Sequence, residues 1–126
     1  MTSTELEQAF VAWADRIVAR AVEAIAYNFN LYEHQDAWAV QLVGTGSFDP
    51  ANPDWACDET FSSGEDLFVI PKDVAGDSWD AGLAFAKPLI SRYLQTGTYA
   101  SRLNAAAAVG VGFVDGDLEV VHRRRP

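Results

Sequence analysis

The first part of the chain carries apolar residues at intervals of three and four, the spacing of one face of an α-helix. Thr2 and Thr4 each stand three residues before a glutamate, as in a capping box. The pattern predicts an amphipathic helix that begins there and continues to about residue 25, with its aromatic side chains in the core. The apolar positions are Leu6, Phe10, Trp13, Ile17 and Ile25, with Ala9, Ala21 and Ala24 beside them.

The period then changes to two, which is the spacing of a half-buried β-strand. Residues 25–33 alternate apolar and polar side chains, and residues 37–45 follow with Trp38 and Leu42 on one face after a polar break. We expect these two segments to pair as an antiparallel hairpin.

Turn-forming residues and acids dominate the next segment, residues 44–66. Two prolines there follow Asp49 and Asn52, and such pairs start turns because proline disfavours a helical conformation of the preceding residue. The segment predicts an irregular loop to about residue 54, a short strand over 55–61, a turn over 62–64 and a strand over 67–70.

A second helical region follows. Asp77 or Ser78 can cap a helix whose apolar residues recur at helical spacing from Trp79 onward, and Gly97 can end it. Because proline removes a backbone donor and clashes with the preceding turn, Pro88 predicts a kink or a split in this helix.

The last part of the chain predicts a shorter helix over residues 99–105 and then a β-hairpin. Apolar residues alternate with glycines over 109–113, Asp115-Gly116 is a two-residue turn signal, and residues 118–122 return. The glycines in the first strand leave room for another segment to lie close against it.

The order of these elements predicts an α+β fold and a single domain over residues 1–126. We expect a mostly antiparallel sheet of about six strands, with an N-terminal helix and a second, kinked helical region packed on one face. The other face would be polar, and such a face is either solvated or a binding surface. The residues expected on it or near its edge are Asn28, Asn30, Tyr32, Gln41 and Glu119.

Composition agrees with a folded protein, since 49% of the 126 residues are hydrophobic and 12% are aromatic. The single cysteine, the acidic first residues and the lack of a long apolar run predict a cytoplasmic protein without a signal peptide or a membrane span. Nine basic residues against eighteen acidic ones give a net charge of −9. An acidic surface disfavours direct binding of nucleic acid or anionic lipid and favours basic protein partners, although it also serves solubility alone.

Motifs for catalysis or for cofactor binding are missing from the sequence, so we expect no enzyme, no catalytic residues, no cofactor and no metal. Cys57 could act as a nucleophile only with His34 or His122 beside it. Asp115, Asp117 and Glu119 stand at alternate positions, so their carboxylates could bind a hard cation such as Mg²⁺ or Ca²⁺. The spacing of a calcium-binding loop is missing, however, and a solvated turn is the favoured interpretation.

Six acids and no basic residue lie between residues 49 and 66. Like charges this close repel each other, and a basic partner would relieve the repulsion, with Trp55 as an aromatic anchor. The alternative is a solvated acidic loop with Trp55 in the core. The residues predicted to bind a partner are Asp49, Asp54, Trp55, Asp58, Glu59, Glu65 and Asp66, together with Asp115 and Asp117 in the hairpin turn.

Four segments stand out between about Ile25 and Glu119: NFNLYE (28–33), FDP with DWACDE (48–59), the helix from Trp79 through Tyr93-Leu94, and VGVGFVDGDLE (109–119). In these segments the sequence resembles small immunity proteins of bacterial polymorphic-toxin and contact-dependent growth inhibition systems. The resemblance implies a compact α+β protein, without catalytic residues, that binds one cognate toxin domain and blocks its active site or substrate entry.

Two hypotheses of function therefore stand side by side. In the first, the chain binds and neutralises a basic, nuclease-like toxin domain through its acidic segment and hairpin turn, as a monomer or a homodimer. In the second, it is a small-ligand-binding domain or a small enzyme that uses the polar sheet face, with Asn28, Asn30, Tyr32 and the glycine strand lining a pocket. The missing set of nucleophile, base and orienting residue favours the first.

Overall fold

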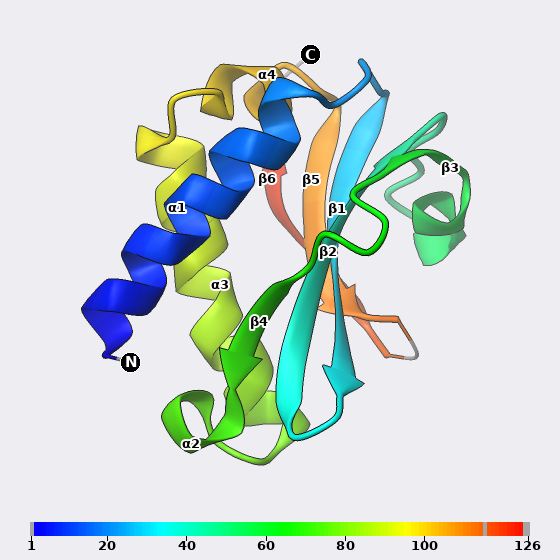
Figure 1. Ribbon diagram of the computed structural model, residues 1–126. Helices are drawn as coiled ribbons and strands as arrows, with labels where there is room; N and C mark the ends of the chain where they lie inside the picture. Colours follow the sequence, from blue (N-terminus) through cyan, green and yellow to red (C-terminus); the bar gives the residue numbers. More distant parts are fainter. Residues whose placement is uncertain (1, 115, 125–126) are drawn as a thin grey trace.

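The computed structural model describes residues 2–114 and 116–124. Figure 1 shows the helices and strands and their order along the chain. The elements are α1 (Ser3–Ala19), β1 (Ala26–His34), β2 (Ala37–Thr45), the 3₁₀ helix η1 (Pro53–Cys57), β3 (Glu59–Ser62), β4 (Phe68–Pro71), α2 (Lys72–Ala75), α3 (Trp79–Thr96), α4 (Ala100–Asn104), β5 (Ala108–Phe113) and β6 (Leu118–Arg123).

The six strands form one sheet in the order β3-β2-β1-β5-β6, and β4 pairs with the other end of β2. All neighbours are antiparallel except β1 and β5, which run parallel at the centre. Helices α1 and α3 cover one face of this sheet (Figure 1). The predicted α+β fold, the mostly antiparallel sheet and the β1–β2 hairpin are therefore confirmed.

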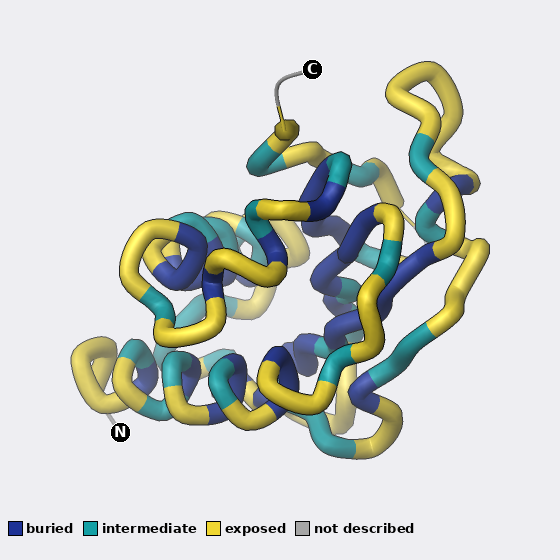
Figure 2. Tube along the Cα trace, turned by 90° about the horizontal axis from the view of Figure 1, so that it is seen from above, coloured by how far each residue is buried: buried dark blue, intermediate teal, exposed yellow. Residues whose placement is uncertain are grey.

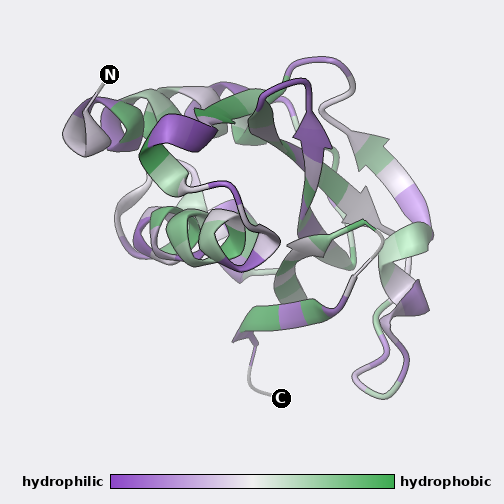
Figure 3. Cartoon of the chain, turned by 90° about the horizontal axis from the view of Figure 1, so that it is seen from below, coloured by the Kyte–Doolittle hydropathy of each residue, from purple (hydrophilic) through white to green (hydrophobic). Residues whose placement is uncertain are grey.

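The core lies between the helices and the sheet, and Figures 2 and 3 show buried and hydrophobic residues gathered there. Tyr27, Phe29 and Leu31 of β1 point to this side because alternate strand residues share a face. Phe10 of α1 meets Phe68 edge-on, with ring centroids 5.1 Å apart. Trp38 is fully buried, and its indole N–H donates to the carbonyl of Gly76 at 2.8 Å.

Helix α1 begins as predicted, because the Thr2 side chain and Glu5 form a complete capping box. Its predicted end at about Ile25 is wrong, since the helix ends at Ala19 and Ile25 is 52% exposed. The Arg102 guanidinium of α4 donates to the carbonyls of Val18 and Ala19 and so satisfies the last turn.

Helix α3 starts at the predicted cap, Ser78, whose hydroxyl accepts from the Ala81 amide, and it ends at Gly97. Of the two outcomes predicted for Pro88, a kink or a split, the split does not occur, because Trp79–Thr96 is one continuous helix. Ala84 and Pro88 both lie on the exposed side of the helix. Because Pro88 has no backbone N–H, the Ala84 carbonyl lacks its intrahelical donor, and on the exposed side water can bind it instead.

Two local predictions between and after the central strands differ from the structure. Residues 55–57 belong to η1 rather than to a strand, because the Asn52 side chain accepts from the Asp54 amide and Pro53 starts the turn.

In the final hairpin, β5 ends at Phe113 and β6 begins at Leu118, so the connection is longer than two residues. Asp115, in the predicted turn, lies outside the described residues.

Candidate functional site

The face of the sheet turned away from the helices carries a row of polar side chains. Asn28 of β1 pairs with Val43 and Gly110, and Asn30 pairs with Gln41 and Gly112 on the neighbouring strands. Paired residues point to the same face, so these side chains form one surface across β2, β1 and β5. The polar face predicted from the alternation in β1 is therefore present for Asn28, Asn30 and Gln41.

Glu119 has a different position from the one expected. It pairs with Val111, a core residue, and its carboxylate forms an ion pair with Lys87 of α3. It therefore faces the helical side of the edge strand β6 and not the polar face.

The loop that contains η1 folds over one end of this polar face (Figure 1). Trp55 is only 5% exposed and forms a second hydrophobic cluster with Ala26 and Ala108 on the sheet. Phe48 packs edge-on against its ring, with centroids 5.2 Å apart, and Leu118 adds to the cluster. Of the two interpretations of Trp55, an exposed anchor for a partner and a buried residue, the exposed anchor is wrong, because the indole is buried and fixes the loop to the sheet.

The two glycines of β5 allow this close packing. A Cβ at Gly110 would lie 2.6 Å from Asn28 Oδ1, and one at Gly112 would lie 2.4 Å from the backbone oxygen of Asp117. Both distances are far below van der Waals contact, so any side chain there would push away Asn28 or the returning strand. The prediction that another segment lies close against this strand is confirmed.

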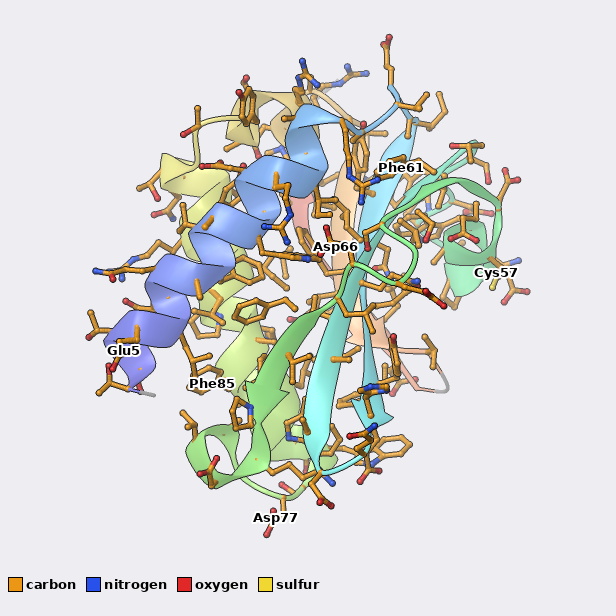
Figure 4. The ribbon with its side chains drawn as sticks, in the orientation of Figure 1. Glu5, Cys57, Phe61, Asp66, Asp77 and Phe85 are labelled. Atoms are coloured by element: carbon orange, nitrogen blue, oxygen red, sulfur yellow. The ribbon has the colours of Figure 1, made fainter. Side chains whose placement is uncertain are left out.

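A groove of about 330 Å³ remains between the η1 loop, the polar face and the β5–β6 connection. Asn28, Asn30 and Gln41 line it from the sheet, and Asp54 and Glu59 line it from η1 and β3. Cys57 also lines it and is exposed (Figure 4). The groove is of a size that takes a small ligand or one long side chain.

The groove is rich in hydrogen-bond acceptors. The Asn28 amide N–H donates to Asn30 Oδ1, while the Asn28 oxygen is buried and has no hydrogen-bond partner among the described residues. The Gln41 amide N–H donates to the Gly64 carbonyl at 3.1 Å, so the amide oxygen of Gln41 is the end of this side chain that can accept. The floor and the acidic wall can therefore accept hydrogen bonds from a donor-rich ligand.

The predicted partner-binding acids fall into two groups. Asp49 and Asp117 line a second hollow, of about 250 Å³, which shares Pro53 and Leu118 with the groove that Asp54 and Glu59 line. Asp58 adjoins Glu59 and is exposed. Glu65 and Asp66 lie apart from these, in the connection between β3 and β4.

Asp66 lies against α1 (Figure 4), and the Arg16 guanidinium donates to both of its carboxylate oxygens, at 2.9 and 3.1 Å. These hydrogen bonds, with the charges of Arg16 and Arg20, hold the pKa of Asp66 below its ordinary value. The Trp13 indole N–H also donates to the Asp66 backbone oxygen at 3.0 Å. Asp66 therefore ties the β3–β4 connection to α1 and is not part of the candidate surface.

The lowered pKa gives Asp66 a pH-dependent contribution to stability. A carboxylate whose pKa is lower in the folded than in the unfolded chain stabilises the fold above about pH 4 and loses that effect as pH falls through its folded pKa. We expect Asp66→Asn to lower the free energy of unfolding by at most about 1 kcal/mol at neutral pH, because the pair is exposed. Denaturant titrations of both proteins between neutral and acid pH should show this difference shrinking as pH falls, and a constant difference would contradict the assignment.

Several acids of the candidate surface have no basic neighbour. In the residues that the structure describes, the ion pairs involve Glu7, Glu33, Asp66 and Glu119. Six other acids have no side-chain nitrogen of a described lysine or arginine within ion-pair distance. They are Asp49, Asp54, Asp58, Glu59, Glu65 and Asp117. Around η1 the negative charge is therefore uncompensated within the described chain.

The C-terminal arginines do not neutralise this group directly. Arg123 lies over the Phe48 ring at 5.6 Å, and Arg124 donates to the Ala105 carbonyl at 2.8 Å. Each of these two residues is thus held by a specific contact away from the acids around η1. Arg125 lies outside the described residues.

An exposed aromatic pair next to the groove was missed by the sequence pattern. Trp79 is 50% exposed and stacks on Phe113 with centroids 4.9 Å apart. A hollow beside them is lined also by Tyr32 and Val114, and Val114 lines the groove as well. The sequence does contain one signal for this exposure. Trp79 directly follows the Ser78 cap, and a side chain in the first turn of a helix has fewer neighbours to cover it.

No cluster of three or more metal-ligating side chains exists among residues 2–114 and 116–124. None of the helices in these ranges is sufficiently long and apolar to cross a membrane. Comparisons with known protein families, with curated proteins and with solved structures found no match.

Proposed function

We propose that this chain is an immunity-type protein that binds a basic, nuclease-like toxin domain through the acidic surface around η1. The observation that carries the proposal is the set of exposed carboxylates there that have no ion-pair partner within the described chain. This surface consists of Asp49, Asp54, Asp58, Glu59 and Asp117.

The physics of association supports this choice. Uncompensated charges of one sign raise the rate at which an oppositely charged partner arrives, and they discriminate against acidic partners. The surface is also held rigidly, because Trp55 packs the η1 loop onto the sheet. A preformed surface binds with less loss of conformational entropy than a mobile loop would.

Co-expression tests the proposal. Where a neighbouring gene encodes a toxin-like domain, the chain is produced together with that domain, and host growth and co-purification of the pair are scored. Rescue of growth with a stable complex is the expected result. Toxicity without rescue, or rescue without a complex, would contradict neutralisation by binding.

Charge reversal should separate the η1 surface from the overall charge. We expect the Asp54→Lys, Asp58→Lys, Glu59→Lys variant to associate with the toxin domain at least about tenfold more slowly, with folding unchanged. Stopped-flow association at low and high salt measures the rate, and salt should slow the wild-type protein in the same way.

The matched control is Glu23→Lys, Asp73→Lys, Asp77→Lys, which changes the net charge equally at exposed acids on other parts of the molecule. Equal slowing by both triple variants would mean that the total charge, and not the η1 surface, drives association.

The groove favours a second candidate function, a small-ligand-binding domain or small enzyme that uses the polar sheet face. Its support is the predicted polar residues Asn28 and Asn30, which line a cavity of about 330 Å³. A thermal-shift screen against metabolites tests this candidate. A hit whose stabilisation is lost in Asn30→Ala would favour it, and a screen without hits would count against it.

A further inference from the structure

We infer that the groove beside η1 receives an arginine side chain of the partner. This inference rests on the proposed function, because it names the group that the acidic surface recognises. It is drawn from the charge of the groove wall, the hydrogen-bonding state of its floor and its size.

The wall supplies the charge complementarity. Asp54 and Glu59 both line the groove, and no residue that lines it is basic among those described. Neither carboxylate has an ion-pair partner in the described chain. A cation that enters the groove therefore meets two negative charges without displacing an internal partner.

Asn28 provides an observation that does not depend on charge. Its side chain is 2% exposed and lines the groove, and its Oδ1 has no hydrogen-bond partner in the described chain. A buried polar oxygen without a partner is costly, and such atoms are rare in folded proteins.

The pattern of donors and acceptors selects arginine over lysine. The Asn28 and Gln41 amides each donate one hydrogen bond within the protein, while Asp54 and Glu59 add carboxylate oxygens that only accept. A guanidinium has five N–H donors in a rigid plane and can bridge several oxygens, whereas an ammonium is a compact point charge with stronger hydration. Several acceptors placed along a groove therefore match the guanidinium better.

The test uses L-argininamide as the probe and L-lysinamide as the comparison. Each is titrated into the ¹⁵N-labelled protein while the side-chain amide resonances of Asn28, Asn30 and Gln41 are followed. We expect saturable shifts of these resonances, with a millimolar dissociation constant for argininamide that is at least about threefold lower than for lysinamide.

Two variants show whether the groove is the site. Asp54→Asn together with Glu59→Gln removes the wall charges with little change of shape and should weaken argininamide binding by about tenfold. Glu5→Gln, at an exposed acid of α1 on the other side of the sheet (Figure 4), should leave it unchanged. Absence of saturable shifts, equal binding of both probes, or equal weakening by both variants would overturn the arginine site.

The outcome is distinguishable from that of the proposed function. Neutralisation of the toxin domain without argininamide binding would overturn the arginine site alone. Argininamide binding without any rescue in co-expression would overturn the immunity function alone, and the groove would then serve another basic partner.

Discussion

Replacing Trp13 by alanine is expected to lower the free energy of unfolding by about 3–5 kcal/mol, the usual range for a buried tryptophan. The side chain is 3% exposed, and its ring packs against those of Phe10 and Phe68, at centroid distances of 5.7 and 6.0 Å. Alanine would leave a cavity between α1 and β4 and would also leave the Asp66 backbone oxygen without the indole donor. Chemical denaturation followed by circular dichroism measures the loss.

Trp79→Ala is the matched control, because it removes the same side chain from the start of another helix. Trp79 is half exposed, and its main contact is the stack on Phe113, so the expected cost is about 1 kcal/mol. Similar losses in the two variants would show that Trp13 is not a core residue in solution.

Replacing Trp55 by alanine is expected to cost about 3 kcal/mol and to release the η1 loop from the sheet. Trp55 joins the loop to Ala26 and Ala108, and Phe48 packs against it. Since Asp54 adjoins Trp55, the acidic wall of the groove should lose its fixed position as well. Hydrogen exchange of residues 46–58 should become faster. If the proposed immunity function holds, association with the toxin domain should weaken as well.

Cys57→Ala controls for local disturbance, because Cys57 lies in the same 3₁₀ helix and is exposed. It should change neither stability nor exchange noticeably. Unchanged exchange of residues 46–58 in the Trp55 variant would contradict the role of Trp55 as the loop's attachment to the sheet.

The elements that the sequence predicts well are those in which local periodicity and burial agree. The alternation in β1 has a period of two because Tyr27, Phe29 and Leu31 contact the helices while Asn28 and Asn30 face away. The ends of elements are less predictable when a distant residue decides them. Helix α1 ends where Arg102 reaches its last carbonyls, and no local pattern around residue 19 contains that contact.

The candidate site, too, is predictable from the sequence in its residues but not in their arrangement. Its acids and its polar sheet residues are visible in the sequence, but their meeting in one groove depends on how the η1 loop folds back. Trp55 illustrates the difficulty, since an aromatic residue among acids is compatible with an exposed anchor and with a buried attachment. The structure decides for burial because Gly110 leaves space above β5, and the ring of Trp55 lies near it.

The parallel pairing of β1 with β5 has a consequence for synthesis of the protein on the ribosome. β1 is made early, but the strand that completes its hydrogen bonding is made only near residue 113. Until then the nascent chain has a β1–β2 hairpin with one open edge, which chaperones or another chain could occupy. The sheet face that supports the groove is complete only after β5 has emerged, so an unfinished chain would have acidic residues but no assembled binding surface.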